Sequence, residues 1–294
     1  MVSDRARTVA FADALKEVVN DGDHVIDFGT GTGLLAMLSA LAGADRVYGL
    51  DRTIIAEYAS RLVEENDLAD LVSIIRVDAK DFTPDQPVDL IVSEWLGHFA
   101  YTENMLPAVL ACRDKDLREG GVMMPSAVDL LLAPVETPGL YADGPGFWDI
   151  NIRGIDFSSL ETAEVMQAIA VKTVIRPEEV IARPRSLVRV DLAKVAPEDV
   201  WQSGTLEFVI QRDAIFYGFA GWFDAQLSPS VNLGTGPWAP TTHWQQTYFP
   251  LEPRKVFEGE RLPVEYTLSE HPGQSTSVAL RLIVDGERYN FMVN

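Results

Sequence analysis

The sequence predicts an α/β domain built on a parallel, helix-covered sheet, followed by an antiparallel β-rich domain. Two observations support this. In residues 1–133, short apolar runs alternate with helical segments at the spacing of strand–helix units. After Met124-Pro125 the runs become β-branched, aromatic and often alternating, with Gly and Pro between them. The change places the boundary of the two domains, 1–133 and 134–294, near Ala133–Pro138.

The individual elements follow from the same patterns. In the first domain we expect strands over His24–Phe28, Arg46–Leu50, Leu71–Val77 and Val88–Ser93, and helices over Gly33–Ala42 and Ile54–Asn66. In the second we expect strands over Ser186–Asp191, Gly204–Ile210, Ala214–Ala225, Leu262–Thr267 and Ser277–Val284. Between the two sets, Phe147–Pro184 includes a helical stretch, Ser159–Ala170, and this region is typical of an insertion or arm.

Composition excludes several classes of protein. The 294 residues carry a net charge of −20, spread over both halves, so nucleic acid is not an expected partner. Such acidity attracts cationic substrates, although it could equally serve solubility alone. No apolar run is long enough for a transmembrane helix, and no signal peptide is evident. The single cysteine, Cys112, excludes an internal disulfide and a cysteine-rich metal site, so we expect it to be a packing residue in a cytoplasmic protein without a metal.

A glycine-rich loop is the first candidate site. Asp27-Phe28-Gly29-Thr30-Gly31-Thr32-Gly33 follows a predicted strand and opens a predicted helix, where Gly29, Gly31 and Gly33 let the backbone approach a ligand. Asp51 ends the next strand, where a carboxylate can bind both hydroxyls of a ribose. The pattern predicts a nucleoside ligand; glycines that merely make a tight turn are the alternative.

Two details separate the possible nucleosides. The loop has the spacing G-x-G-x-G, and Asp27 precedes it; a carboxylate there opposes a pyrophosphate but suits a ligand that carries an ammonium and a sulfonium. We therefore predict S-adenosyl-L-methionine as the cofactor, with Thr30 also in its site. Asp78, after the third strand, can accept a hydrogen bond from an adenine amino group, unless it is simply an exposed loop acid.

A second candidate site follows the fourth predicted strand. There Glu94 and Glu103 bracket a largely apolar, aromatic loop at the carboxyl edge of the sheet, where α/β proteins bind ligands. Two carboxylates in apolar surroundings need a cation to offset their burial. A guanidinium fits because its planar fork can pair with two carboxylates. The loop therefore predicts a guanidinium-bearing acceptor.

With these residues in place, the sequence resembles the protein arginine methyltransferases over essentially its whole length. The resemblance rests on Ser93-Glu94-Trp95-Leu96-Gly97…Tyr101-Thr102-Glu103-Asn104-Met105-Leu106, similar to the double-glutamate loop of that family, and on Thr242-His243-Trp244, similar to its Thr-His-Trp loop. Arg113-Asp114-Lys115…Met124-Pro125 and Met1…Asp4…Arg7-Thr8 match in addition. The resemblance implies a Rossmann-like methyltransferase domain, an antiparallel β-barrel-like domain and a helical dimerisation arm.

The family's roles transfer by position. Glu94 and Glu103 would clamp the acceptor guanidinium, with Glu94 also at the cofactor. Arg7 would meet the cofactor carboxylate, and His243 with Asp4 would relay a proton. The remaining implied contacts are Asp51 to the ribose, the Asp78 carboxylate and Ala79 backbone to the adenine, and Trp95, Met105 and Trp244 to the substrate, with Met1 and Met105 lining the active site. His98, inside the double-glutamate loop, has no assigned role.

The arm, at about 155–184, implies a homodimer. The expected acceptor is a cationic, guanidine-bearing protein, peptide or small molecule, and no nucleic acid or membrane is expected.

The sequence also departs from the pattern of the family. Members carry a helix with two tyrosines ahead of the segment that matches Met1, and this sequence begins after it, so we expect a more open site or a lid from elsewhere. The family's adenine-contacting glutamate falls near Lys80, and Thr30 stands where cysteine is common.

Two other functions fit the same sequence. One is a methyltransferase of a small-molecule amine or guanidine, suggested by the absence of the lid helix. The other is a catalytically silent scaffold that binds the cofactor and acts through its dimer.

Overall fold

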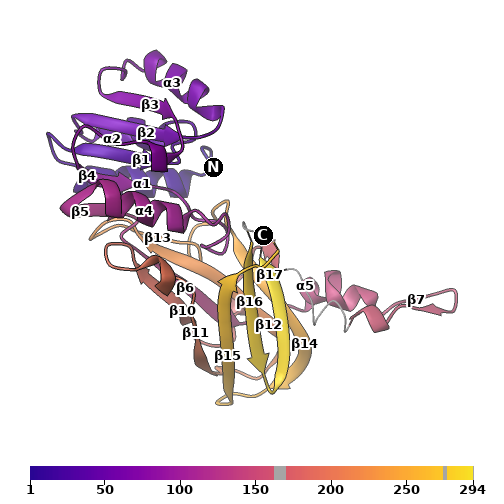
Figure 1. Cartoon of the computed structure of the whole chain (residues 1–294). Helices are drawn as coiled ribbons and strands as arrows, with labels where there is room; N and C mark the ends of the chain where they lie inside the picture. The colour runs from indigo at the N-terminus through magenta and orange to yellow at the C-terminus, as the bar shows by residue number, and fades with distance from the viewer. Residues whose placement is uncertain (162–169, 274–276, 294) are drawn as a thin grey trace.

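A parallel sheet and two antiparallel sheets make up the body of the protein, and a narrow segment projects from it (Figure 1). The computed structural model describes residues 1–161, 170–273 and 277–293. The helices are α1 Arg5–Val18, α2 Leu34–Leu41, α3 Ile55–Glu65, α4 Leu106–Asp116 and α5 Pro138–Asp143, with short 3-10 turns η1 Ala79–Asp81, η2 Pro145–Trp148, η3 Pro177–Glu179 and η4 Pro197–Asp199. The strands are β1 His24–Phe28, β2 Arg46–Asp51, β3 Val72–Arg76, β4 Val88–Val92, β5 Leu117–Met124, β6 Ala127–Pro134, β7 Asn151–Ile152, β8 Ile155–Asp156, β9 Val171–Thr173, β10 Arg185–Asp191, β11 Ser203–Val209, β12 Ala214–Gln226, β13 Asn232–Gly234, β14 Gln246–Val256, β15 Arg261–Glu270, β16 Val278–Val284 and β17 Glu287–Val293.

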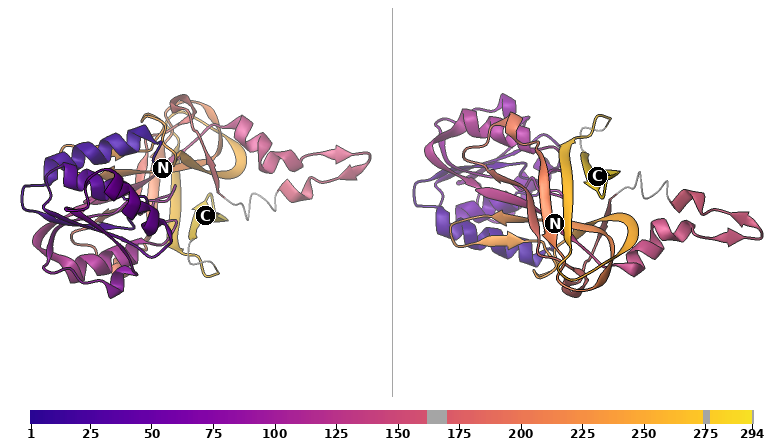
Figure 2. Two further views of the ribbon diagram at one scale, coloured as in Figure 1. Left: turned by 90° about the horizontal axis from the view of Figure 1, so that it is seen from above. Right: turned by 90° about the horizontal axis from the view of Figure 1, so that it is seen from below.

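The first sheet has the order β3-β2-β1-β4-β5, and every neighbouring pair is parallel. Helices lie on both of its faces (Figure 2), and its central strand β1 is buried at four of five positions. The strand order reverses between β1 and β4, so the loops that follow these two strands diverge and leave a crevice for a ligand. The predicted α/β domain is confirmed, with each expected strand and helix in place; α1, α4 and β5 were not predicted.

The remaining strands form an antiparallel, barrel-like pair of sheets. One has the order β10-β6-β12-β14-β9 with β13 on β12, and the other has the order β11-β15-β16-β17. Residues on β15 alternate between buried and exposed, as expected where one face packs on a core. Phe249 on β14 and Phe291 on β17 meet edge to face at 5.1 Å, so the aromatic core joins the two sheets. The predicted antiparallel β domain is likewise confirmed.

The projecting segment begins earlier than expected. α5, η2, β7 and β8 extend away from the body in both views of Figure 2, whereas we predicted an arm over about 155–184. β9 has already returned to the body and pairs with β14. Most of the predicted helix Ser159–Ala170 lies outside the described residues. The predicted domain boundary between residues 133 and 134 falls within β6. The division of the chain into 1–133 and 134–294 stays a prediction.

Side chains fasten the parallel sheet to the barrel. The guanidinium of Arg113 on α4 donates to the carbonyls of Leu192 and Val195 at 2.7 and 2.9 Å. Glu17 on α1 accepts hydrogen bonds from the hydroxyls of Ser228 and Ser230 at 2.5 and 2.6 Å. These bonds join α1 and α4 to segments that follow strands of the barrel. Within the described ranges, no helix combines the length and apolarity needed to cross a membrane.

Candidate active site

The glycine-rich loop leaves β1 through a series of left-handed turns. Gly29, Gly31 and Gly33 have φ angles of +74°, +54° and +79°, a region that residues with a Cβ rarely adopt. Asp27 lies beneath the loop and is only 1% exposed. Its carboxylate accepts hydrogen bonds from the Thr30 hydroxyl at 2.6 Å and from a backbone amide of α2 at 2.9 Å. Burial raises the pKa of Asp27 to about 6, although these two bonds oppose the rise. In this structure Asp27 and Thr30 therefore brace the loop, and their contacts to the cofactor stay predictions.

Asp51 brings the end of β2 to the same loop. Its carboxylate accepts from the Gly31 amide at 3.1 Å and from the amide and hydroxyl of Thr53 at 2.8 and 2.7 Å. A Cβ built on Gly31 would meet nothing closer than 4.0 Å, so there is open space beside that residue. An open backbone next to a carboxylate suits a ribose, and these residues fit S-adenosylmethionine.

Met105 lies over the other end of the glycine loop. A Cβ on Gly29 would come within 2.9 Å of the Met105 terminal methyl, so the end of the methionine side chain would have to shift to admit it. Asp78 caps the turn η1: it accepts from the Lys80 amide at 3.2 Å and pairs with the Lys80 ammonium at 3.4 Å. The carbonyl of Ala79 accepts from Lys115 at 3.2 Å. The adenine contacts proposed for Asp78 and Ala79 stay predictions.

Glu94 is the buried member of the glutamate pair. Its side chain is 6% exposed, and its Oε2 atom accepts from Nε and a terminal nitrogen of Arg7, both at 3.2 Å. Its Oε1 atom accepts from the Leu96 amide at 3.0 Å. Burial raises the pKa of Glu94, the Arg7 guanidinium opposes the rise, and the nearby Glu103 adds to it. Arg7 therefore supplies the positive charge that a buried carboxylate needs.

Glu103 lies at the other end of the same loop and is exposed. Packing around its carboxyl group still raises its pKa. Glu103, Asn104 and Ala100 have φ angles of +89°, +51° and +54°. Three left-handed residues with side chains in one loop indicate backbone strain of the kind that gathers at functional sites.

His243 and Asp4 come together from opposite ends of the chain. The His243 ring Nδ1 lies 2.8 Å from Asp4 Oδ2, and the His243 amide donates to the same oxygen at 2.7 Å. Burial alone would raise the pKa of Asp4, but these bonds and one from the Arg7 amide outweigh it and lower the pKa. Asp4 is therefore a carboxylate, so Nδ1 donates and the other ring nitrogen keeps its lone pair free. Burial lowers the pKa of His243 although Asp4 opposes the shift, so the ring is neutral at pH 7.

The first two turns of α1 connect these groups. Asp4 caps the helix through the Arg7 amide at 3.1 Å, and the Arg7 side chain reaches Glu94. A groove of about 860 Å³ opens beside the pair Asp4–His243, between α1 and the segment from Asn232 to Thr241. Met1 is 61% exposed at the start of the chain, and its role stays a prediction.

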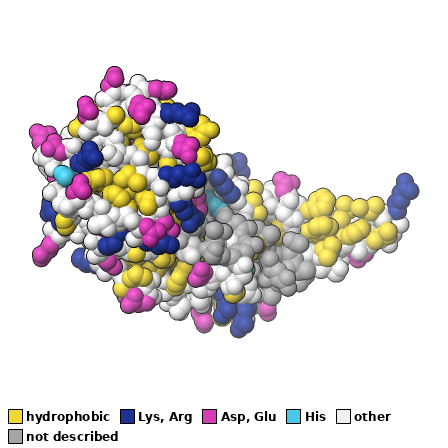
Figure 3. Space-filling model, turned by 45° about the horizontal axis from the view of Figure 1, so that its top comes forward, with side chains coloured by type: hydrophobic (Ala, Val, Ile, Leu, Met, Phe, Trp, Pro, Cys, Tyr) yellow, Lys and Arg dark blue, Asp and Glu magenta, His cyan; other side chains and the backbone are white. Residues whose placement is uncertain are grey.

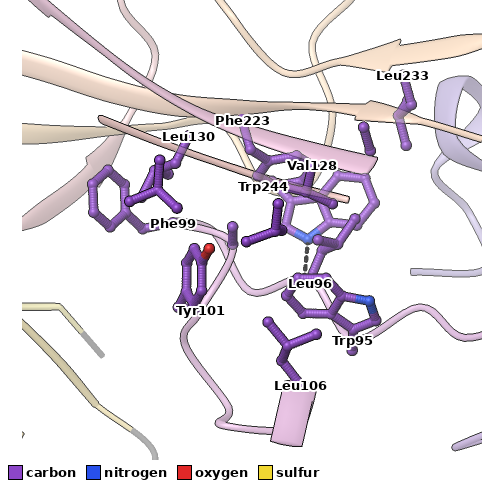
Figure 4. Packing of buried hydrophobic residues seen from close by; sticks show 14 of the residues in the cluster. Trp95, Leu96, Phe99, Tyr101, Leu106, Val128, Leu130, Phe223, Leu233 and Trp244 are labelled. Carbon is purple, nitrogen blue, oxygen red and sulfur yellow. Dashed lines mark hydrogen bonds between the residues drawn. The ribbon is translucent and has the colours of Figure 1, made fainter. Parts of the chain in front are cut away.

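Trp95 and Trp244 are buried supports of the double-glutamate loop. They are 1% and 2% exposed, and Figure 4 shows both indoles packed among apolar side chains. The Trp244 indole N–H donates to the carbonyl of Leu96, one residue beyond Trp95. The structure thus has these tryptophans holding the loop, and their predicted contact with substrate stays untested.

Cys112 and His98 are not among the side chains that contact one another in the candidate active site. Cys112 is 4% exposed and acts in packing, and burial raises its pKa to about 12. Burial, with some help from Lys172, lowers the pKa of His98 to about 4, so this ring is uncharged at neutral pH. No group of three potential metal ligands occurs within the described residues.

The structure brings Arg7, Glu94, Glu103, Asp4 and His243 to the junction of the two domains. Two contacts there were not predicted from the sequence, namely the Arg7–Glu94 ion pair and a hydrogen bond from Asn104 to Glu270 at 3.1 Å. Nothing in the local pattern around Glu270 marks it, because β15 is otherwise an ordinary alternating strand.

Comparison with known families and structures agrees with this geometry. The model of the arginine methyltransferase oligomerization subdomain matches residues 127–285. The model of the ribosomal protein L11 methyltransferase family matches residues 6–122. Among solved structures, a chain of the Trypanosoma brucei PRMT1 enzyme–prozyme heterotetrameric complex with AdoHcy superposes with a TM-score of 0.93 at 27% identity, covering 100% of this chain and 96% of that one. Arabidopsis thaliana protein arginine methyltransferase 10, in an open conformation, gives 0.85 at 27% identity over 100% and 96% of the two chains.

Curated proteins of similar sequence are named protein arginine N-methyltransferases. Protein arginine N-methyltransferase 2 of Xenopus tropicalis is 32% identical over 98% of this chain and 70% of its own length. Protein arginine N-methyltransferase 1 of Schizosaccharomyces pombe is 35% identical over 85% of this chain and 74% of its own length. Together with the matched subdomain and the shared fold, these relatives show that the chain belongs to the protein arginine N-methyltransferases, enzymes that use S-adenosylmethionine.

Proposed function

We propose that this chain transfers a methyl group from S-adenosylmethionine to an arginine guanidinium of a protein or peptide, with Glu94 and Glu103 holding the acceptor. The observation that carries the proposal is the glutamate pair itself. Burial raises the pKa of both carboxyl groups, and the nearby Glu103 adds to the rise at Glu94, so a cation between the two carboxylates would be stabilised.

The acceptor must be made nucleophilic. A guanidinium stays protonated near pH 7, since its pKa lies above about 12, and its lone pairs are delocalised. Two carboxylates that contact two of its nitrogens fix its plane and draw positive charge toward those nitrogens. The third nitrogen is then the better nucleophile. Bound S-adenosylmethionine supplies a methyl group that its sulfonium already activates, so positioning the acceptor is the chain's main contribution.

His243 is suited to take the proton that the acceptor loses. The lowered pKa keeps its ring neutral at pH 7, and Asp4 holds Nδ1 by a 2.8 Å contact, which leaves the opposite ring nitrogen as the base. Asp4 would then stabilise the imidazolium that forms. Arg7 in this scheme would meet the carboxylate of the cofactor while it stays beside Glu94.

The glycine loop and its neighbours would hold the cofactor. Gly29, Thr30, Gly31 and Gly33 would surround its amino-acid portion above Asp27, and Asp51 would bind the ribose. Asp78 and the Ala79 backbone would contact the adenine, and Met105 would line the active site on the substrate side.

Methyl transfer to a defined acceptor tests the proposal. Purified protein with radiolabelled cofactor should label an arginine-rich peptide, and acid hydrolysis should release the label as methylarginine. Glu94→Gln should abolish labelling, whereas Glu119→Gln, a matched change at an exposed glutamate, should leave it intact. Absence of labelling on every guanidine would refute the proposal. Neither the small-molecule acceptor nor the silent scaffold is favoured by the relatives' names.

We also propose that the protein acts as a homodimer in the cytoplasm. The projecting segment exposes Phe147, Ile152, Ile155 and Leu160 by 55, 50, 62 and 40%, and Figure 3 shows a continuous apolar surface on it. A second copy would cover this surface.

The single cysteine supports a reducing compartment, which is the ground for the cytoplasmic location. The dimer is tested separately. Sedimentation should give a dimer that Ile155→Glu dissociates and Phe257→Glu, at an exposed site on the barrel, does not; a monomeric wild type would exclude the dimer.

A further inference from the structure

We propose that Glu270 is a positioning residue for Glu103 and acts through Asn104. The inference rests on the proposed function of Glu103, and it concerns how the exposed end of the double-glutamate loop keeps its geometry. Glu270 is the last residue of β15, far from the loop along the chain, and its Oε1 atom accepts a hydrogen bond from Asn104 Nδ2 at 3.1 Å.

The two ends of the loop are held by unequal means. The first end is tied down by the Arg7–Glu94 ion pair, by the Leu96 amide on Glu94 and by the Trp244 indole on the Leu96 carbonyl. The second end has a weak turn bond from the Asn104 amide to the Tyr101 carbonyl at 3.3 Å, and the side-chain bond to Glu270. Tyr101, which is buried, also packs on Trp201 at 5.6 Å between ring centroids. Asn104 therefore adds a directional hydrogen bond to the ring packing that ties this end of the loop to the rest of the chain.

The backbone at this end needs that support. Glu103 and Asn104 follow one another in left-handed conformations, with φ of +89° and +51°. Asparagine tolerates such a conformation better than most residues, but glutamate does not. A strained pair relaxes unless the surroundings hold it. Relaxation at Asn104 would turn the Glu103 side chain directly, because the two residues share a peptide bond.

Glu270 is a firm point of attachment. β15 is paired on one side with β11 and on the other with β16, and Glu270 itself lies opposite Val278. The barrel thus fixes the backbone from which the exposed Glu270 side chain reaches the Asn104 amide, and this bond ties the turn that carries Glu103 to β15. The bond needs an oxygen acceptor at position 270 but no charge.

The test compares substitutions at the two ends of this bond. Glu270→Ala and Asn104→Ala should each lower kcat on an arginine peptide about 3- to 10-fold, the range of one lost hydrogen bond, with the KM for the cofactor unchanged. Glu270→Gln should keep wild-type kcat because its amide oxygen accepts the same bond. The double alanine variant should be no slower than either single variant. Glu265→Ala, at an exposed glutamate of the same strand, is the matched control.

A readout independent of activity accompanies the kinetics. Amide hydrogen exchange at residues 103–105 should be faster in Glu270→Ala than in wild type, and unchanged in Glu270→Gln and Glu265→Ala. Exchange that is unaltered in Glu270→Ala would overturn the proposal, as would a Gln variant as slow as the Ala variant or additive losses in the double variant. If instead Glu103→Gln retains full activity while the exchange result holds, the role proposed for Glu103 fails and the contact remains.

Discussion

Glu94 and Glu103 carry the same chemical group on one loop, yet the fold surrounds them differently. Glu94 is 6% exposed, paired with Arg7 and bonded to the Leu96 amide. Glu103 is exposed and has a left-handed backbone, and it forms no ion pair within the described part of the chain. One carboxylate is thus preorganised before any acceptor arrives, while the other depends on its backbone. Under the proposed function, the buried member would set the electrostatics of the pair and the exposed member would complete the clamp.

The largest expected effect separates the two by substitution. Glu94→Gln should lower kcat by about 10³-fold and Glu103→Gln by about 10²-fold, since removal of one preorganised group costs about 10²–10³. Only Glu94→Gln should also lower the melting temperature, because it leaves the Arg7 guanidinium buried without a counter-charge. Steady-state kinetics and thermal melts check this. Equal loss of stability in both variants would contradict the distinction between them.

A second prediction concerns pH. Both glutamates must be ionised to hold a guanidinium, and both have raised pKa values. Activity is therefore present above the raised pKa values and lost as pH falls through them, at a higher pH than for an ordinary glutamate of pKa about 4.3. Arg7 lowers the pKa of Glu94, so Arg7→Gln should move this acid limb to higher pH. Profiles of kcat/KM at saturating cofactor measure the limb; an unmoved limb would mean that Arg7 does not govern the ionisation.

The smallest expected effect concerns the support of the Glu94 end. Trp244→Phe removes the indole N–H that donates to the Leu96 carbonyl and leaves that buried acceptor unsatisfied, a cost of about 1–3 kcal/mol. Trp238→Phe, at a tryptophan that is 59% exposed, should change stability by no more than about 0.5 kcal/mol. Urea denaturation of both variants measures the difference. Equal midpoints would show that Trp244 contributes through packing alone.

Much of the fold could be predicted because its signals are local. The run His24–Phe28, the glycines after it and Asp51 at the end of the next strand define a strand–loop–helix unit within a few dozen residues. The helix α1 was not predicted because its apolar face is narrow, with Phe11, Ala14 and Leu15 among charged residues. The start of the projecting segment was likewise missed, since α5 spans only six residues.

The candidate site divides in the same way. Its residue types and spacing, from Glu94 to Glu103 and at His243, were evident in the sequence, and with them the cofactor and the class of acceptor. That Asp27 braces the loop from beneath, and that Trp95 and Trp244 are buried, could not be predicted, because both facts depend on which side of the backbone the neighbouring elements pack.

The order of the elements, the glycine loop and the two glutamates can be predicted from the amino-acid chain alone, because each depends on residues close together in it. The contacts that join them depend on the packing of the folded protein. Arg7 reaches Glu94 across 87 positions, Asn104 reaches Glu270 across 166, and His243 reaches Asp4 across 239. Such contacts form when the parallel sheet and the barrel pack against each other, and no local pattern encodes a pairing between two surfaces that meet only in the folded chain.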